Sequence, residues 1–428
     1  MTAAFTLGSI VRQAALALTL AGMAAASTAQ TAAPPAYWSP SWMAATQPLW
    51  DDSFVLPSGV PLQFHRQTVR QMARLSIGGA RLRVVISNEG GNSPLHIGAA
   101  RVARHLEGST IVEGSDRAVR FGGQGEVTVP PGARLISDPV DLPLPALSEV
   151  AVSLYLPRPS QPAGFHFDAR QTAYVADGDL TAAPRLPAAS TTQWTTRVYV
   201  SGLIVETPRA PTTVVALGDS ITDGNGSTPG ANTRWPDALA QRLAERNVGV
   251  LNAGISGGRL LKDGMGRAAL ERVGRDVFSQ PGVRAMVVML GTNDIGWPGG
   301  AFAPQEHAVR AEEVIQGFRQ LIEMAHAHNV RIMGATIPPN ERALEGTPLV
   351  GHHSPEKNQV REAVNRWIRE SGAFDAVVDF DALLRDPARP IRMHSAMDSG
   401  DHLHPGDAGY AAMAAAIDLD ALLGGPGR

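Results

Sequence analysis

The hydrophobic pattern of this 428-residue chain changes its period once, near residue 212. Before that point, apolar and polar residues alternate in short runs such as Val150–Leu156, between turns rich in Gly, Pro and Asn. No stretch of residues 37–207 keeps a helical period over any length. Many short alternating strands are typical of two antiparallel sheets packed face to face, so we expect a jelly-roll-like β-sandwich over 37–207.

Beyond residue 212, strand-like and helix-like runs alternate. This alternation predicts an α/β domain with a parallel sheet and helices on both faces, and such sheets bind ligands at the carboxyl ends of their strands. The clearest helix follows Pro304 and ends at Asn329, a residue that tolerates left-handed backbone. We expect strands over 213–217, 248–252, 284–290, 330–336 and 376–380, and helices over 234–246, 305–328, 355–371 and 406–422.

The segment Glu206–Pro211 separates the two patterns and is predicted to be a linker. It contains two prolines, and so short a connection leaves little freedom between its flanking parts. We therefore expect two domains, 37–207 and 212–425, that pack against each other. The first shows no Ser/His/Asp set or metal cluster, so it is expected to be an accessory domain.

The first 29 residues have the pattern of an export signal. Arg12 precedes the apolar stretch 14–26, and the small residues Ser27–Ala29 suit cleavage before Gln30. The apolar stretch is shorter than the ~20 residues that span a bilayer. We expect a signal peptide over 1–29, no membrane span in the mature chain, and a periplasmic or secreted location.

Composition excludes several classes of function. The chain has no cysteine, which rules out disulfides, thiolate metal sites and a cysteine nucleophile. Its net charge is −3 and it has no run of Lys and Arg, so nucleic-acid binding is not expected. Nothing in the sequence indicates an oligomeric state.

Two motifs carry groups suited to acyl transfer. Ser220 closely follows the apolar run 213–217, and Asp401 stands three residues before His404. A serine hydroxyl becomes a nucleophile when an imidazole removes its proton, and a carboxylate holds that imidazole in the required tautomer. Asn293, after the third predicted strand, adds an amide donor suited to a developing oxyanion.

Four segments together resemble the sequence blocks of the SGNH hydrolases, also called the GDSL lipase/esterase family. The resemblance covers 212–425 and implies a flavodoxin-like fold. We expect an esterase of this kind to need no metal or cofactor. One position departs from the family pattern: His402 stands where glycine is commoner, and it would narrow the mouth of the pocket. The matching segments are Gly218–Ser220, Asn252–Gly257, Gly291–Asp294 and Asp401–Pro405.

The same resemblance implies the roles of individual residues. Ser220 would be the nucleophile, His404 the base and Asp401 the carboxylate that orients it. The oxyanion hole would consist of the N–H of Ser220, the N–H of Gly257 and the side-chain amide of Asn293.

The substrate is indicated less sharply. Gly218–Gly224, together with Arg234–Asp237, resembles a subgroup that includes xylan-associated acetylesterases and arylesterases. We therefore expect an exported serine esterase that removes short acyl groups, above all O-acetyl groups on carbohydrate, from small-molecule or polysaccharide esters. The alternatives are a lipase or arylesterase acting on other esters, and a non-catalytic carbohydrate-binding surface protein.

A second serine also matches a known motif. Gly254–Gly258 reads G-x-S-x-G, which would make Ser256 the nucleophile of an α/β-hydrolase. That motif requires a helix directly after the serine, and Arg259–Gly266 is a poor helix start. Gly224–Gly226 lacks the glycine spacing of a dinucleotide-binding loop. The histidines that could suggest a metal site are expected to face solvent in loops: His352, His353, His394 and His402.

Overall fold

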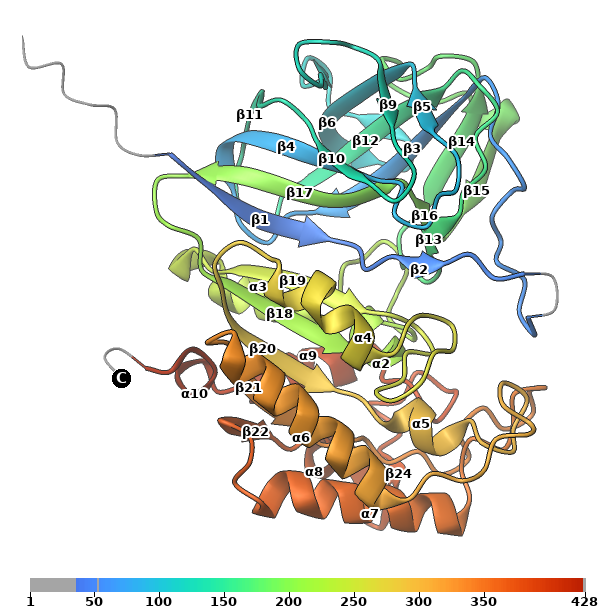
Figure 1. Cartoon of the computed structure of the whole chain (residues 1–428), viewed down its shortest axis with the longest axis vertical. Coiled ribbons are helices and arrows are strands. Elements are labelled where there is room, and N and C mark those ends of the chain that lie inside the picture. Colours follow the sequence, from blue (N-terminus) through green and yellow to red (C-terminus); the bar gives the residue numbers. More distant parts are fainter. Residues whose placement is uncertain (1–35, 52–53, 426–428) are drawn as a thin grey trace, which may run out of the picture. The chain divides into compact units, whose positions relative to one another are not determined.

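Antiparallel sheets occupy the first half of the chain and one parallel sheet the second half (Figure 1). The structure is a computed structural model that describes residues 36–51 and 54–425. The predicted signal peptide, 1–29, lies outside the described residues. Within the described residues, no helix combines the length and the apolar character needed to cross a membrane.

The N-terminal region, 37–207, contains two large antiparallel sheets and two small ones. One large sheet has the order β1 (Tyr37–Met43), β17 (Val200–Thr207), β4 (Gly79–Ser87), β10 (Arg134–Ile136), with β11 (Val140–Leu144) also on β4. The other has the order β15 (Thr191–Trp194), β14 (Ala173–Asp177), β3 (Gln67–Arg74), β12 (Glu149–Leu156), β6 (Ala99–Glu107), β7 (Thr110–Ile111), with β8 (Arg117–Ala118) on β6. The small sheets are β16 (Arg197–Val198), β13 (Gly164–His166), β2 (Gln47–Pro48), and the pair β5 (Leu95–Ile97), β9 (Val127–Val129).

The two large sheets share one hydrophobic core. Val152 of β12 and Leu203 of β17 belong to the same cluster of buried side chains, although their strands lie in different sheets. Along β12 the register with β3 is unbroken, with Val152 opposite Gln71. The predicted antiparallel, strand-rich character of 37–207 is confirmed, whereas its jelly-roll-like sandwich topology stays a prediction.

The C-terminal region contains a five-stranded sheet in which every neighbouring pair is parallel. Numbered along the chain within this sheet, the strand order is 2-1-3-4-5, which is the order of flavodoxin-like folds. The predicted α/β architecture is confirmed. The strands are β19 (Gly249–Gly254), β18 (Thr213–Gly218), β20 (Val283–Met289), β21 (Arg331–Ala335) and β22 (Ala376–Val378).

Helices cover both faces of this sheet, which explains the unbroken apolar run of β18. Val215 and Leu217 pack in one core with α4 (Ala269–Val273), α6 (Ala311–Ala327) and α7 (Pro355–Glu370). Val214 and Ala216 point the opposite way, because side chains alternate along a strand. They pack in a second core with α3 (Trp235–Leu243), α8 (Phe380–Leu384), α9 (Asp407–Ala416) and α10 (Leu419–Leu423).

Several predicted helix limits were wrong, and each error has a local cause. Helix α6 begins at Ala311 rather than at 305, because Glu313 accepts a hydrogen bond from the N–H of Arg310 (2.8 Å) and so caps the helix there. The predicted helix 406–422 is two helices. Asp418 starts the second by accepting hydrogen bonds from two backbone N–H groups. Asn329 has the left-handed backbone that was predicted (φ 56°).

Candidate active site

Ser220 opens a one-turn helix, α2 (Ser220–Asp223), directly beyond the carboxyl end of β18. The preceding residue, Asp219, caps this turn by accepting a hydrogen bond from the N–H of Ile221 (3.0 Å). Asp219 is fully buried, and burial raises its pKa to about 7. At Gly218 a Cβ would lie only 2.9 Å from the carbonyl oxygen of Met289 on β20, so glycine lets the chain turn against the sheet.

The structure brings Ser220, His404 and Asp401 together. His404 Nε2 lies 2.8 Å from Ser220 Oγ, and His404 Nδ1 lies 2.6 Å from Asp401 Oδ2. The other oxygen of Asp401 accepts the N–H of Leu403 (2.9 Å) and of His404 (2.8 Å). Carboxylate, imidazole and hydroxyl therefore form one continuous chain of hydrogen bonds.

The positions of the protons in this hydrogen-bonded triad follow from the surroundings of Asp401. Burial opposes ionisation of Asp401, but the hydrogen bonds and charge of His404 and the backbone N–H groups hold the pKa of Asp401 well below its usual value. An ionised Asp401 requires a proton on His404 Nδ1. Nε2 is then free to accept the proton of Ser220, which is the arrangement needed for a serine nucleophile.

Two of the predicted oxyanion-hole residues, Gly257 and Asn293, lie on segments that a hydrogen bond connects. Asn293, in α5 (Thr292–Gly296), donates from Nδ2 to the carbonyl oxygen of Gly258 (3.0 Å). Gly257 has φ 71°, and a Cβ there would lie 2.3 Å from Met265 Sδ. Only glycine fits this backbone and this space.

Ser256 is held by carboxylates. Its N–H and Oγ donate to Asp223 Oδ2 (2.9 and 3.1 Å), and Oγ also lies 3.3 Å from Asp168 Oδ2. Among the described residues, no histidine forms a hydrogen bond with its hydroxyl. The next helix, α4, begins only at Ala269. The geometry is therefore unlike that of a nucleophile elbow.

The prediction that the loop histidines face solvent was wrong for His352. Its side chain is 4% exposed, and burial, reinforced by the charge of Lys357, lowers its pKa to about 3. Its Nε2 lies 3.3 Å from Asn293 Oδ1. The ring fits because Gly296 has no side chain: a Cβ there would lie 2.3 Å from the imidazole. The sequence carries no local signal for that contact.

The remaining loop histidines form no metal cluster. His402 Nδ1 lies 2.6 Å from Asp398 Oδ2, and His353 and His394 are partly buried. Over residues 36–51 and 54–425, no group of three or more His, Asp or Glu side chains could hold a metal ion.

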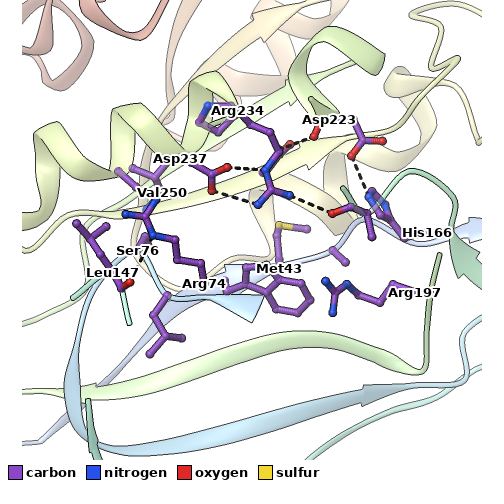
Figure 2. A pocket seen from close by; sticks show the side chains of 17 residues that line it. Met43, Arg74, Ser76, Leu147, His166, Arg197, Asp223, Arg234, Asp237 and Val250 are labelled. Atoms are coloured by element: carbon purple, nitrogen blue, oxygen red, sulfur yellow. Dashed lines mark hydrogen bonds and ion pairs between the residues drawn. The ribbon is translucent and has the colours of Figure 1, made fainter. Parts of the chain in front are cut away.

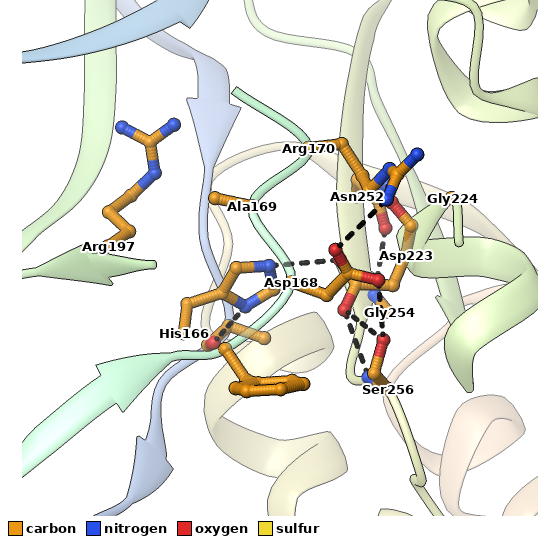
Figure 3. A network of polar contacts seen from close by, with 12 residues as sticks. His166, Asp168, Ala169, Arg170, Arg197, Asp223, Gly224, Asn252, Gly254 and Ser256 are labelled. Atoms are coloured by element: carbon orange, nitrogen blue, oxygen red, sulfur yellow. Dashed lines mark hydrogen bonds and ion pairs between the residues drawn. The ribbon is translucent and has the colours of Figure 1, made fainter. Parts of the chain in front are cut away.

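The N-terminal region also reaches this site. His166 Nε2 lies 2.9 Å from Asp223 Oδ1, and Asp168 lies beside Ser256 (Figure 3).

A separate cavity of about 40 Å³ lies between strands of the N-terminal region and α3 (Figure 2). Arg74, Arg197 and Arg234 line it, and burial, with the nearby charge of Arg234, lowers the pKa of Arg197 to about 9. Neither Ser220 nor His404 borders this cavity, so it is not the ester-binding site.

A match to a known protein family covers most of the C-terminal region. Residues 216–412 match the sequence profile of the GDSL-like Lipase/Acylhydrolase family. No curated protein matches the chain.

The chain is also similar to solved structures. One is a carbohydrate acetylesterase family member from Sinorhizobium meliloti (19% identity, 50% of this chain and 99% of that chain, TM-score 0.38). Another is a GDSL-like lipase from Bacteroides thetaiotaomicron (20% identity, 49% of this chain and 87% of that chain, TM-score 0.36). A third is an acetyl xylan esterase (19% identity, 47% and 96%, TM-score 0.35).

The matched segment contains Ser220, Asn293, Asp401 and His404. The C-terminal region of this chain belongs to the GDSL-like lipase/acylhydrolase family, and the protein is a carboxylic ester hydrolase.

Proposed function

We propose that the protein is a serine esterase in which Ser220, His404 and Asp401 form the catalytic triad. The observation that carries the proposal is the hydrogen-bonded chain from Asp401 Oδ2 through His404 to Ser220 Oγ, with distances of 2.6 and 2.8 Å. Ser220 lies just beyond the carboxyl end of β18, and open α/β sheets bind ligands at the carboxyl ends of their strands.

The reaction proceeds through an acyl-enzyme. Ser220 Oγ attacks the ester carbonyl carbon while His404 Nε2 takes the hydroxyl proton. The tetrahedral intermediate collapses, the C–O bond to the alcohol breaks, and His404 gives its proton to the leaving alkoxide. Water, deprotonated by His404, then attacks the acyl group and releases the acid, which restores Ser220 with its proton.

The oxyanion hole is proposed to consist of the N–H of Ser220, the N–H of Gly257 and Asn293 Nδ2. Two structural features support this choice. Gly257 lies on the loop after β19, which contacts α2 through the hydrogen bond from Ser256 to Asp223, and Asn293 donates to the carbonyl oxygen of the neighbouring Gly258. Donors of this kind stabilise the negative charge that develops on the carbonyl oxygen. No metal or cofactor takes part in any of these steps.

The proposed substrate is a short-chain ester, in particular an O-acetyl group on carbohydrate. Support comes from the resemblance of Gly218–Gly224 and Arg234–Asp237 to acetylesterase sequences, and from the predicted export of the chain. The alternative is an arylesterase or lipase acting on other esters. The proposal includes a periplasmic or secreted location after loss of residues 1–29, and an accessory domain (37–207) before a catalytic domain (212–425).

Hydrolysis assays test this proposal. The purified protein should hydrolyse p-nitrophenyl acetate and release acetate from acetylated xylan. Ser220→Ala should abolish both activities, whereas Ser190→Ala, a change at an exposed serine of the N-terminal region, should leave them unchanged. A maximum of activity on long-chain p-nitrophenyl esters would contradict the carbohydrate substrate, and full activity of Ser220→Ala would contradict the triad.

A further inference from the structure

The imidazole of His166, at the end of β13, contacts residues of both regions of the chain (Figure 3). Nδ1 lies 2.9 Å from the carbonyl oxygen of Ala45, and Nε2 lies 2.9 Å from Asp223 Oδ1. A carbonyl oxygen and an ionised carboxylate both only accept hydrogen bonds. Both ring nitrogens therefore donate, and His166 is an imidazolium paired with Asp223.

The surroundings support this charge. Burial of His166 opposes protonation, but the carboxylate of Asp223 and the hydrogen bonds to the ring outweigh it and raise the pKa of His166 above its ordinary value. Arg197 acts in the opposite direction. Within the described part of the chain, His166 is the only side chain that forms an ion pair with Asp223.

Asp223 also forms hydrogen bonds with the loop that follows β19. Its second oxygen, Oδ2, accepts both the N–H (2.9 Å) and the Oγ–H (3.1 Å) of Ser256. Ser256 directly precedes Gly257, the residue proposed to supply an oxyanion N–H. Gly257 is held from its other side by Met265 and Trp297, which leave no room for a Cβ.

A second buried carboxylate, Asp168, adds negative charge near Asp223, which the positive charge of His166 offsets. Asp168 Oδ2 lies 3.3 Å from Ser256 Oγ, and burial together with the negative charge of Asp223 raises the pKa of Asp168. Arg170 approaches Asp168 at 3.7 Å. Without the imidazolium, Asp223 would keep a buried negative charge beside Asp168 with no paired cation, which is unfavourable. The carboxylate would then move and release Ser256.

We infer that His166 is a positioning residue for the oxyanion hole, acting through Asp223 and Ser256 on the peptide N–H of Gly257. This inference rests on the proposed function. It gives the N-terminal region a direct part in the reaction, because His166 belongs to that region while the groups it orients belong to the α/β region. Donor positions must hold to within about 0.5 Å to stabilise a transition state, so a small movement of this loop is enough to lower the rate.

The test compares His166→Gln with His65→Gln, a change at an exposed histidine of the same region. Steady-state rates are measured on p-nitrophenyl acetate and on its thiono analogue, in which sulfur replaces the carbonyl oxygen. We expect kcat of His166→Gln on the oxygen ester to fall about 10- to 100-fold, less than the full loss of one oxyanion donor, with KM within about twofold. The oxygen ester should lose more activity than the thiono ester, because a sulfur anion depends less on the oxyanion hole.

A general packing defect would slow both esters equally, and an unchanged preference for oxygen over sulfur would overturn the inference. Asp223→Asn provides a second, isosteric variant in case His166→Gln does not fold. It should show the same loss of preference, and the double variant should lose little more than either single one. Ser220→Ala is assayed in parallel. If it stays active, the proposed function fails; if it is inactive while His166→Gln and Asp223→Asn behave like wild type, only the present inference fails.

Discussion

His404 Nε2 lies 2.8 Å from Ser220 Oγ, although 184 residues separate the two in the chain. Ser220 follows β18, the first strand of the parallel sheet along the chain, whereas His404 lies beyond β22, the last strand. The contact therefore exists only when the whole α/β region has folded, and it makes the esterase activity a sensitive report of that fold.

The hydrogen bond between Asp401 and His404 predicts the effect of an isosteric change. Asp401→Asn should lower kcat about 10⁴-fold, because an amide can leave His404 with its proton on the wrong nitrogen. The melting temperature should change little. Asp420→Asn, at an exposed aspartate of α10, is the matched control. A loss of less than tenfold in Asp401→Asn would mean that another group orients the histidine.

Ser220 and Ser256 can be distinguished directly. Ser220→Ala should be inactive, because it removes the nucleophile. Ser256→Ala removes one hydroxyl contact to Asp223 but keeps the backbone N–H contact, so we expect it to keep at least about a tenth of wild-type kcat. The rates on p-nitrophenyl acetate decide this, and the reverse pattern would make Ser256 the nucleophile.

Gly257→Ala should lower kcat by at least about 10²-fold, a loss comparable to that of one oxyanion donor. The new methyl group would clash with Met265 and Trp297, and the residue would have to leave its left-handed backbone. Gly274→Ala is a suitable comparison, because a Cβ at that position meets no atom within 4 Å. Wild-type turnover by Gly257→Ala would exclude this loop from the oxyanion hole.

A buried ion pair supports the strand ends behind the site. Arg272 donates to the carbonyl oxygens of Gly218 (2.9 Å) and Ala253 (2.7 Å), and to Asp276 Oδ2 (3.0 Å). Asp276→Ala would leave Arg272 buried without this partner and should lower the free energy of unfolding by about 3–5 kcal/mol. Urea unfolding of this variant beside Glu271→Ala, a change at an exposed residue of α4, the helix that contains Arg272, measures the difference.

Stability should depend on pH through His166. Its pKa is raised in the folded state, so the paired imidazolium contributes its full stability below the unfolded-state pKa of 6.5 and loses it as the pH rises through the folded-state value. The groups that face the pair are Asp168, Arg170, Arg197 and Arg234. Urea unfolding between pH 5.5 and 9 should show wild type and His166→Gln converging in stability as the pH rises. A constant difference would show that His166 is not charged.

The sequence predicted most of the α/β region because local signals agree there. The strand beginning at Thr213 lies within one residue of its predicted limits, and Ser220, Asn293, Asp401 and His404 follow strands or precede helices as expected. The start of α6 was missed because the cap formed by Glu313 outweighs the apolar pattern before it. The triad geometry follows from sheet topology, which strand–helix alternation already constrains.

Other features could not be read from the sequence. The contact of His166 with Asp223 depends on how the sheets of the N-terminal region pack beside α2, and no periodicity reports on that arrangement. The burial of His352 likewise depends on a space left by Gly296, 56 residues earlier in the chain. In both cases the decisive partner lies in another element, so neither residue's own neighbours in sequence carry a signal.

The contacts of His166 also bear on protein engineering. Residues 208–212, between β17 and β18, look like the natural crossover point for building chimeras, since they connect one sheet system to the next. A chimera joined there would take Asp223 and Ser256 from one parent and His166 from the other. Recombination at that point would therefore yield folded but slow enzymes unless residues 164–170 were transferred together with the α/β region.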